Sequence, residues 1–132
     1  MGTVGYLLDT HTFLWAVSEY KKLGIKAGEI ISDASSLLYL SAASAYEITN
    51  KKRIGRLAEY EKITENYFYI IKTLNVTELA ISTQHAHFAG EFEWEHRDPF
   101  DRLLAAQAYI DSLTLITNDK NFNTLKWVET LW

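Results

Sequence analysis

The chain has 132 residues, a formal net charge of −4 and 48% hydrophobic residues, which are the size and composition of one globular domain. It contains no cysteine, so disulfide scaffolds, thiolate metal sites and cysteine nucleophiles are excluded. Its acidic balance provides no general basic field, so any nucleic acid must be held by a local patch or through a bound cation.

Short apolar runs alternate with longer amphipathic segments along the chain. The apolar runs are too short for helices and are typical of strands buried on both faces, whereas the longer segments have apolar residues at helical spacing. In chain order, the sequence predicts a strand at 4–8, a helix after Thr10, a helix at 25–34, a strand at 37–40, helices at about 42–53 and 61–74, a strand at 76–81, helices at about 83–90 and 99–111, and strands at 113–117 and 127–131.

The starts of the predicted helices carry capping residues. Thr10 can cap the first helix, and Ser41 is a natural N-cap for the helix that follows the second strand. Asp98 followed by Pro99 is a stronger signal, because aspartate is a favoured N-cap and proline suits the first helical position.

The alternation of strands and helices predicts an α/β fold. We expect residues 1–132 to form a single domain, with a mostly parallel sheet of four to five strands and helices on both faces. In such sheets, ligands bind beyond the carboxyl ends of the strands. No apolar run approaches the roughly 20 residues of a membrane span, and the amino terminus lacks a secretion signal, so we expect a cytoplasmic protein with no membrane contact.

Acidic residues follow several of the predicted strands. Asp9 comes directly after the first strand, Glu47 lies in the second turn of the helix after the second, and Asp119 lies just beyond the fourth. Asp101 lies in the first turn of the helix that begins at Pro99. Carboxylates gathered at one site raise one another's pKa values, and a hard cation such as Mg²⁺ or Mn²⁺ relieves this repulsion. Such a site can activate water and neutralise a phosphate.

Each of these acids also has an ordinary structural explanation. Glu47 and Lys51 have the spacing of a helical ion pair, and Asp101 suits the dipole of its helix. Asp119 suits a turn, and Asp9 can cap the first helix. The sequence leaves these explanations open, although four such placements together favour a shared site.

Four segments of the chain resemble the four motifs of PIN domains, in the same order. More narrowly, they are similar to the VapC-type toxins of type II toxin–antitoxin modules, and the third segment is the most specific. The segments are residues 7–15, 41–48, 96–108 and 115–119.

The resemblance implies a Mg²⁺- or Mn²⁺-dependent endoribonuclease that hydrolyses RNA with a metal-activated water. It also implies a cognate VapB-like antitoxin that silences the enzyme, and a homodimer. The family's metal-binding and catalytic acids fall on Asp9, Glu47, Asp101 and Asp119. The positions expected to support the site are Thr10, Asp98, which we assign to helix capping, and Thr117, whose hydroxyl is expected to bind a ligand or water.

A cluster of basic residues follows Glu47. Lys51, Lys52, Arg53 and Arg56 are the best candidates for binding RNA phosphates, although a solvated helix end explains them equally well. The alternative to a nuclease is a non-catalytic cation-binding, protein-interaction module of PIN-like fold.

Three further residues near the motifs receive no part in catalysis. His11 and His96 could approach the site, but the acids alone account for binding of a hard cation. Arg102 is expected to pair with a nearby carboxylate rather than to contact RNA.

Overall fold

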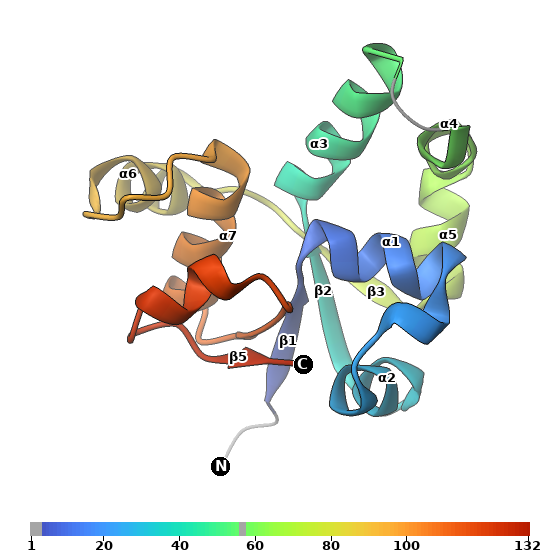
Figure 1. The fold of residues 1–132 in the computed structure, drawn as a ribbon, viewed down its shortest axis with the longest axis horizontal. Coiled ribbons are helices and arrows are strands. Elements are labelled where there is room, and N and C mark those ends of the chain that lie inside the picture. Colours follow the sequence, from blue (N-terminus) through green and yellow to red (C-terminus); the bar gives the residue numbers. More distant parts are fainter. Residues whose placement is uncertain (1–3, 56–57) are drawn as a thin grey trace.

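A five-stranded sheet forms the centre of the protein (Figure 1). The structure is a computed structural model that describes residues 4–55 and 58–132. Every pair of neighbouring strands is parallel, and the strand order is β3-β2-β1-β4-β5. The strands are β1 (Gly5–Leu8), β2 (Leu37–Ser41), β3 (Val76–Leu79), β4 (Thr114–Ile116) and β5 (Thr130–Leu131).

Seven α-helices and two short 3₁₀ helices connect these strands in the described part of the chain. Within these residues, no helix has both the length and the apolar character needed to cross a membrane. The helices are α1 (Thr10–Ser18), η1 (Tyr20–Lys22), α2 (Ile25–Ser32), α3 (Ala42–Arg53), α4 (Ala58–Glu65), α5 (Tyr67–Thr73), α6 (Thr83–Glu91), α7 (Pro99–Ile110) and η2 (Lys120–Thr124).

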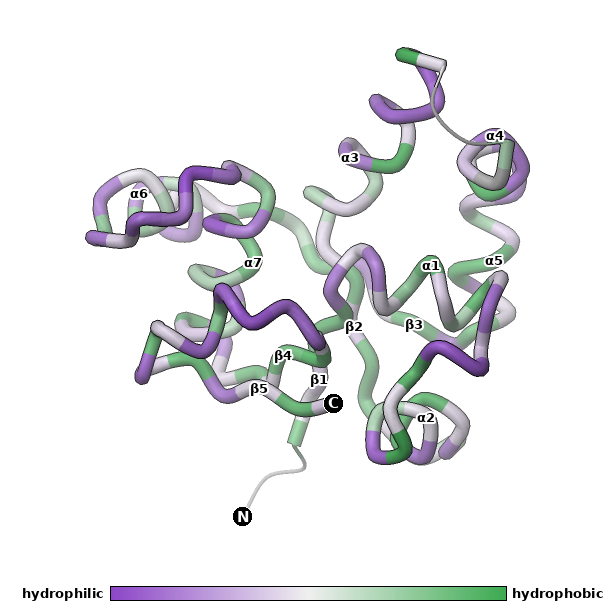
Figure 2. The backbone as a smooth tube through the Cα atoms, in the orientation of Figure 1, coloured by the Kyte–Doolittle hydropathy of each residue, from purple (hydrophilic) through white to green (hydrophobic). Residues whose placement is uncertain are grey.

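Successive strand residues point to opposite faces of the sheet, and other elements pack on both faces. Leu7 and Leu8 are both fully buried, yet they belong to separate hydrophobic clusters. The Leu8 cluster includes residues of α1 to α5, whereas the Leu7 cluster includes residues of α7 and η2. Figure 2 shows hydrophobic residues along β1 and β2 and hydrophilic residues near the outer end of α3. The predicted α/β fold with helices on both faces is confirmed.

The order of the strands reverses beside β1. The chain passes from β1 to β2 and β3 on one side, and then crosses to β4 and β5 on the other. The backbone N–H of Asp9 donates to the carbonyl of Ile116 at 3.1 Å, so the residues that follow β1 and β4 are neighbours. In open parallel sheets, a reversal of this kind opens a crevice at the carboxyl ends of the strands, where ligands bind.

Three predictions of local structure are wrong, and the first is the strand expected at 127–131, of which only Thr130–Leu131 is extended. The single helix expected at 61–74 is two helices, α4 and α5, and the backbone of Asn66 between them departs from helical geometry, with φ −111° and ψ 16°. Thr10 does not cap α1 but is its first residue, and its buried hydroxyl hydrogen-bonds the hydroxyl of Ser44 at 2.8 Å. Asp9 holds the N-cap position, but its side chain makes no capping hydrogen bond there.

Candidate metal-binding site

Asp9 is the buried centre of the candidate site. Its Oδ2 accepts a hydrogen bond of 2.6 Å from the hydroxyl of Thr117, and this hydroxyl oxygen accepts one of 3.0 Å from the backbone N–H of Asp119. The Thr117 side chain therefore links Asp9, which follows β1, to the backbone of Asp119, which follows β4. The Thr117 hydroxyl, which is also expected to bind a ligand or water, donates to a carboxylate in the structure.

Burial is the main factor that raises the pKa of Asp9 above its ordinary value. The hydrogen bond from Thr117 and the nearby His11 lower it, whereas the charges of Glu47 and Asp119 raise it. Glu47 and Asp119 therefore lie close enough to act on Asp9 electrostatically. A divalent cation among these three carboxylates would relieve their repulsion.

Glu47 reaches this centre from α3. The helix begins and ends as predicted, and Ser41 caps it by accepting a hydrogen bond of 2.9 Å from the N–H of Ala43. Glu47 Oε2 pairs with Lys51 Nζ at 2.9 Å, and their side chains are only 12% and 27% exposed. Burial is the largest single effect on the pKa of Lys51 and lowers it, but the hydrogen bond and the charge of Glu47, together with nearby Tyr60 and Asp98, outweigh burial, so the pKa is raised.

The ion pair with Glu47 distinguishes Lys51 from the other basic residues that were predicted to bind RNA. The ammonium group of Lys51 is held at Glu47, inside the candidate site. Lys52 and Arg53 are exposed in the last turn of α3, where positive charges are also favourable to the helix dipole. Arg56 lies outside the described residues.

Asp98 and Pro99 start α7 as predicted. Asp98 Oδ1 accepts hydrogen bonds from the backbone N–H groups of Phe100, at 2.9 Å, and Asp101, at 3.2 Å. This cap fixes the first turn of the helix, and Asp101 Oδ2 lies 2.6 Å from Nε2 of His96. The helix start therefore positions Asp101, and the loop before it positions a histidine.

Burial is also the main cause that raises the pKa of Asp101, to about 7. The hydrogen bond from His96 lowers this pKa, whereas the charges of Asp98 and Asp9 raise it. One ligand atom each of His96, Asp101 and Asp119 lies within 4.8 Å of the other two. The structure thus places Asp101 and Asp119 with His96 in one group of possible ligands. It also places Asp9 within electrostatic range of Glu47, Asp101 and Asp119.

We expect Asp101→Asn to stabilise the metal-free protein. Because the pKa of Asp101 is higher in the folded state than in the unfolded state, its ionisation weakens folding as pH rises from about 4 to about 7. The full penalty, on the order of 2–4 kcal/mol, is present above pH 7 and absent below pH 4. Urea denaturation in EDTA across this range measures it. The prediction is wrong if the variant's gain in the free energy of unfolding, relative to the wild type, does not increase with pH.

Arg102 has a role that the sequence did not reveal. The expected carboxylate partner is wrong, because its hydrogen bonds within the described residues go to backbone carbonyls, including those of Ala89 at 2.8 Å and His96 at 3.4 Å. It also donates to the carbonyl of Phe92, and its guanidinium lies 4.3 Å from the centroid of the Phe92 ring. Arg102 therefore anchors the loop that carries His96.

We expect Arg102→Lys to lower the free energy of unfolding by about 2–3 kcal/mol, because lysine cannot reproduce the planar fork of donors or its stacking. Arg97→Lys is the matched control, since Arg97 is exposed on the same loop. Guanidinium denaturation measures both variants. Equal effects of the two substitutions would show that the contacts of Arg102 contribute little.

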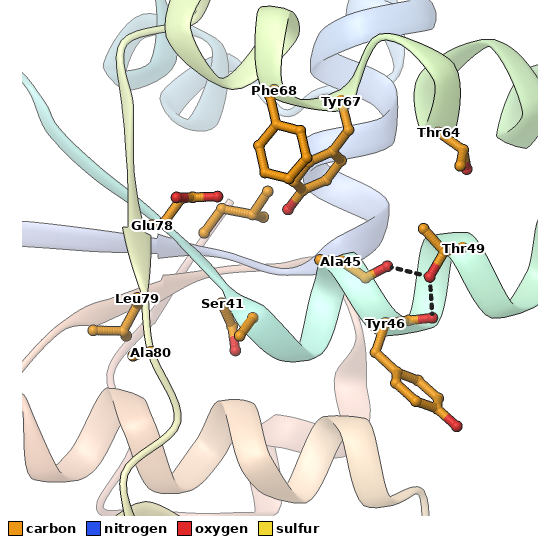
Figure 3. Close-up of a pocket in the computed structure, with 12 residues that line it drawn as sticks. Ser41, Ala45, Tyr46, Thr49, Thr64, Tyr67, Phe68, Glu78, Leu79 and Ala80 are labelled. Carbon is orange, nitrogen blue, oxygen red and sulfur yellow. Dashed lines mark hydrogen bonds between the residues drawn. The ribbon is translucent and has the colours of Figure 1, made fainter.

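An apolar hollow of about 610 Å³ lies on another part of α3. Figure 3 shows Tyr67 and Phe68 of α5 on one side of it and Ala45 of α3 on the other. None of the four candidate acids lines this hollow. It is therefore distinct from the candidate metal-binding site.

The sequence matches the PIN domain family over residues 6–128. The chain belongs to the PIN domain family. This PIN domain is similar in structure to DNA-bound VapBC from Salmonella typhimurium, with a TM-score of 0.72, 18% identity and 98% of each chain covered. No match was found among curated proteins.

Two further solved structures share the fold. VapBC2 from Rickettsia felis, bound to a DNA fragment from its promoter, has a TM-score of 0.69 and 15% identity over 96% of each chain. FitAcB from Neisseria gonorrhoeae has a TM-score of 0.65 and 17% identity, also over 96% of each chain. At these identities, the likeness is evidence of a common fold, as the sequence motifs predicted.

Proposed function

We propose that this PIN domain is a divalent-metal-dependent endoribonuclease and the toxin of a type II toxin–antitoxin module. The observation that carries the proposal is the gathering of Asp9, Glu47, Asp101 and Asp119 at the carboxyl edge of the sheet. Nuclease activity is the general function of PIN domains, which supports the reaction class. The raised pKa values of Asp9 and Asp101 support a cation, because carboxylates held together in a buried place need a positive charge.

The carboxylates of Asp9, Asp101 and Asp119 would hold the cation, with Glu47 beside them. When bound, a divalent ion lowers the pKa of water and neutralises charge on a phosphate. Thr117 donates to Oδ2 of Asp9, and Oδ1 would be the oxygen that contacts the cation. Asp98 would support the site by capping the start of α7, which positions Asp101.

The ion pair of Lys51 with Glu47 has a further use in this proposal. The ammonium group lies against the carboxylate of Glu47 and would supply a positive charge near the place where a phosphate would bind. The exposed Lys52 and Arg53 would then hold the RNA backbone farther along α3, together with Arg56.

The experiment is cleavage of single-stranded RNA of mixed sequence by the purified protein, with MgCl₂ or MnCl₂ and with excess EDTA. We expect metal-dependent cleavage that leaves 5′-phosphate and 3′-hydroxyl ends. Cleavage that persists in EDTA would overturn the metal-dependent mechanism. Bound cation without cleavage of any RNA would favour the non-catalytic interaction module instead.

The proposal includes a protein partner. The similar solved structures are described as VapBC and FitAB complexes, so a VapB-like antitoxin that inhibits cleavage is the partner we expect. We also expect a homodimer, which sedimentation of the purified protein would measure. Co-expression with the product of an adjacent small gene tests inhibition directly, and an unchanged RNA cleavage rate in that complex would argue against a toxin.

A further inference from the structure

We propose that His96 is a direct ligand of the cation, so that the site combines an imidazole nitrogen with carboxylate oxygens and favours a divalent transition-metal ion over Mg²⁺. The inference rests on the proposed function for the role of the cation, but it concerns which atoms bind the ion. Magnesium strongly prefers oxygen ligands, whereas first-row transition metals accept imidazole readily.

The donor atoms already have the spacing of a metal site. One ligand atom each of His96, Asp101 and Asp119 lies within 4.8 Å of the other two. Neighbouring donors around an ion bound at about 2.1 Å are about 3 Å apart, and opposite donors are about 4.2 Å apart. His96 Nε2 and Asp101 Oδ2 are 2.6 Å apart, so small movements would let an ion take the place of the proton between them.

The loop around His96 holds the imidazole at the site. The rings of Trp94 and His96 pack with their centroids 4.9 Å apart, and Trp94 Nε1 donates to the hydroxyl of Thr124 at 2.9 Å. Arg102 donates to the backbone carbonyl of His96. The side chain of His96 is 25% exposed, so an ion can reach it from solvent without unfolding of the loop.

The other histidines lack this environment. Nε2 of His85 lies 3.0 Å from Asp111, and its Nδ1 accepts a hydrogen bond from the N–H of Ser82 in a capping box. His87 is 76% exposed on α6, and the His11 ring packs 6.0 Å from that of Trp15. Among the described residues, His96 is the one histidine that belongs to a group of possible metal ligands.

Pulsed electron paramagnetic resonance of Mn²⁺ bound to the protein tests the proposal without reference to activity. We expect modulation from a directly coordinated imidazole nitrogen in the wild-type protein and in His87→Gln, the matched control. His96→Gln should lose this modulation while it keeps the circular dichroism spectrum of the wild type. Wild-type protein without nitrogen modulation, modulation that survives in His96→Gln, or no bound Mn²⁺ would each overturn the proposal.

Calorimetric titration with each metal provides the second measurement. His96→Gln should weaken Mn²⁺ binding about tenfold or more and change Mg²⁺ binding much less, because only the nitrogen ligand is removed. Equal losses for both ions would overturn the preference. RNA cleavage without nitrogen modulation would refute the histidine ligand alone, whereas nitrogen modulation without cleavage would refute the nuclease and support the ligand.

Discussion

Replacement of Asp9 by asparagine is expected to reduce RNA cleavage at least about a thousandfold, equivalent to about 4 kcal/mol of transition-state stabilisation. The amide can still accept the hydrogen bond from Thr117, so the fold should be retained. It cannot supply the negative charge that holds a cation between the strands. Initial rates of cleavage at saturating Mn²⁺, with circular dichroism of both proteins, measure the effect.

Asp33→Asn is the matched control for this substitution. Asp33 is exposed beyond α2, and its carboxylate accepts hydrogen bonds from the backbone N–H and the hydroxyl of Ser35, which asparagine can also accept. We expect unchanged cleavage by this variant. An Asp9→Asn protein that cleaves RNA at a rate near that of Asp33→Asn would remove Asp9 from the mechanism.

Thr117→Val is expected to lower metal affinity and RNA cleavage about 10- to 100-fold, because the carboxylate of Asp9 loses the hydroxyl that orients it. Valine has nearly the same shape, so the packing at the end of β4 should change little. The same substitution leaves the backbone N–H of Asp119 without its acceptor, which loosens the turn that carries this acid. Titration with Mn²⁺ and the rate of cleavage measure both consequences.

Thr117→Ser separates the hydroxyl from the methyl group. Serine keeps the donor and the acceptor, so metal affinity and cleavage should return to near the wild-type values. If the serine variant behaves like the valine variant, the methyl group rather than the hydrogen bond is what matters, and the proposed positioning of Asp9 is wrong.

The sequence predicted the architecture because each local signal agreed with the fold. The apolar runs were too short for helices, and the caps at Ser41 and Asp98 fixed two helix starts to the residue. The prediction of one helix at 61–74 was wrong because the spacing of apolar residues does not report the non-helical backbone of the single residue Asn66.

The local structural contacts expected for two of the acids are present. Glu47 makes the predicted ion pair with Lys51, and Asp119 caps η2 by accepting from the N–H of Asn121. Both side chains still lie close to Asp9. Residue spacing predicts such local contacts, whereas the gathering of the acids depends on the crossover between β3 and β4, which brings together residues more than 100 positions apart.

The roles of His96 and Arg102 could not be derived from spacing alone. His96 lies five positions before Asp101, outside the helix, so no helical rule places the two side chains together. In the loop between α6 and α7, Phe92 and Trp94 pack against the Leu7 cluster, and Arg102 donates to backbone carbonyls of the loop. These contacts depend on the loop's tertiary path, which local patterns do not encode.

Diffraction from crystals grown with MnCl₂, measured at the manganese absorption edge, tests most directly whether the gathered carboxylates share a cation. The predicted result is an anomalous peak within bonding distance of both Asp9 and Asp101, two acids separated by most of the chain. A fully occupied manganese site elsewhere on the surface, with no peak beside Asp9, would contradict it.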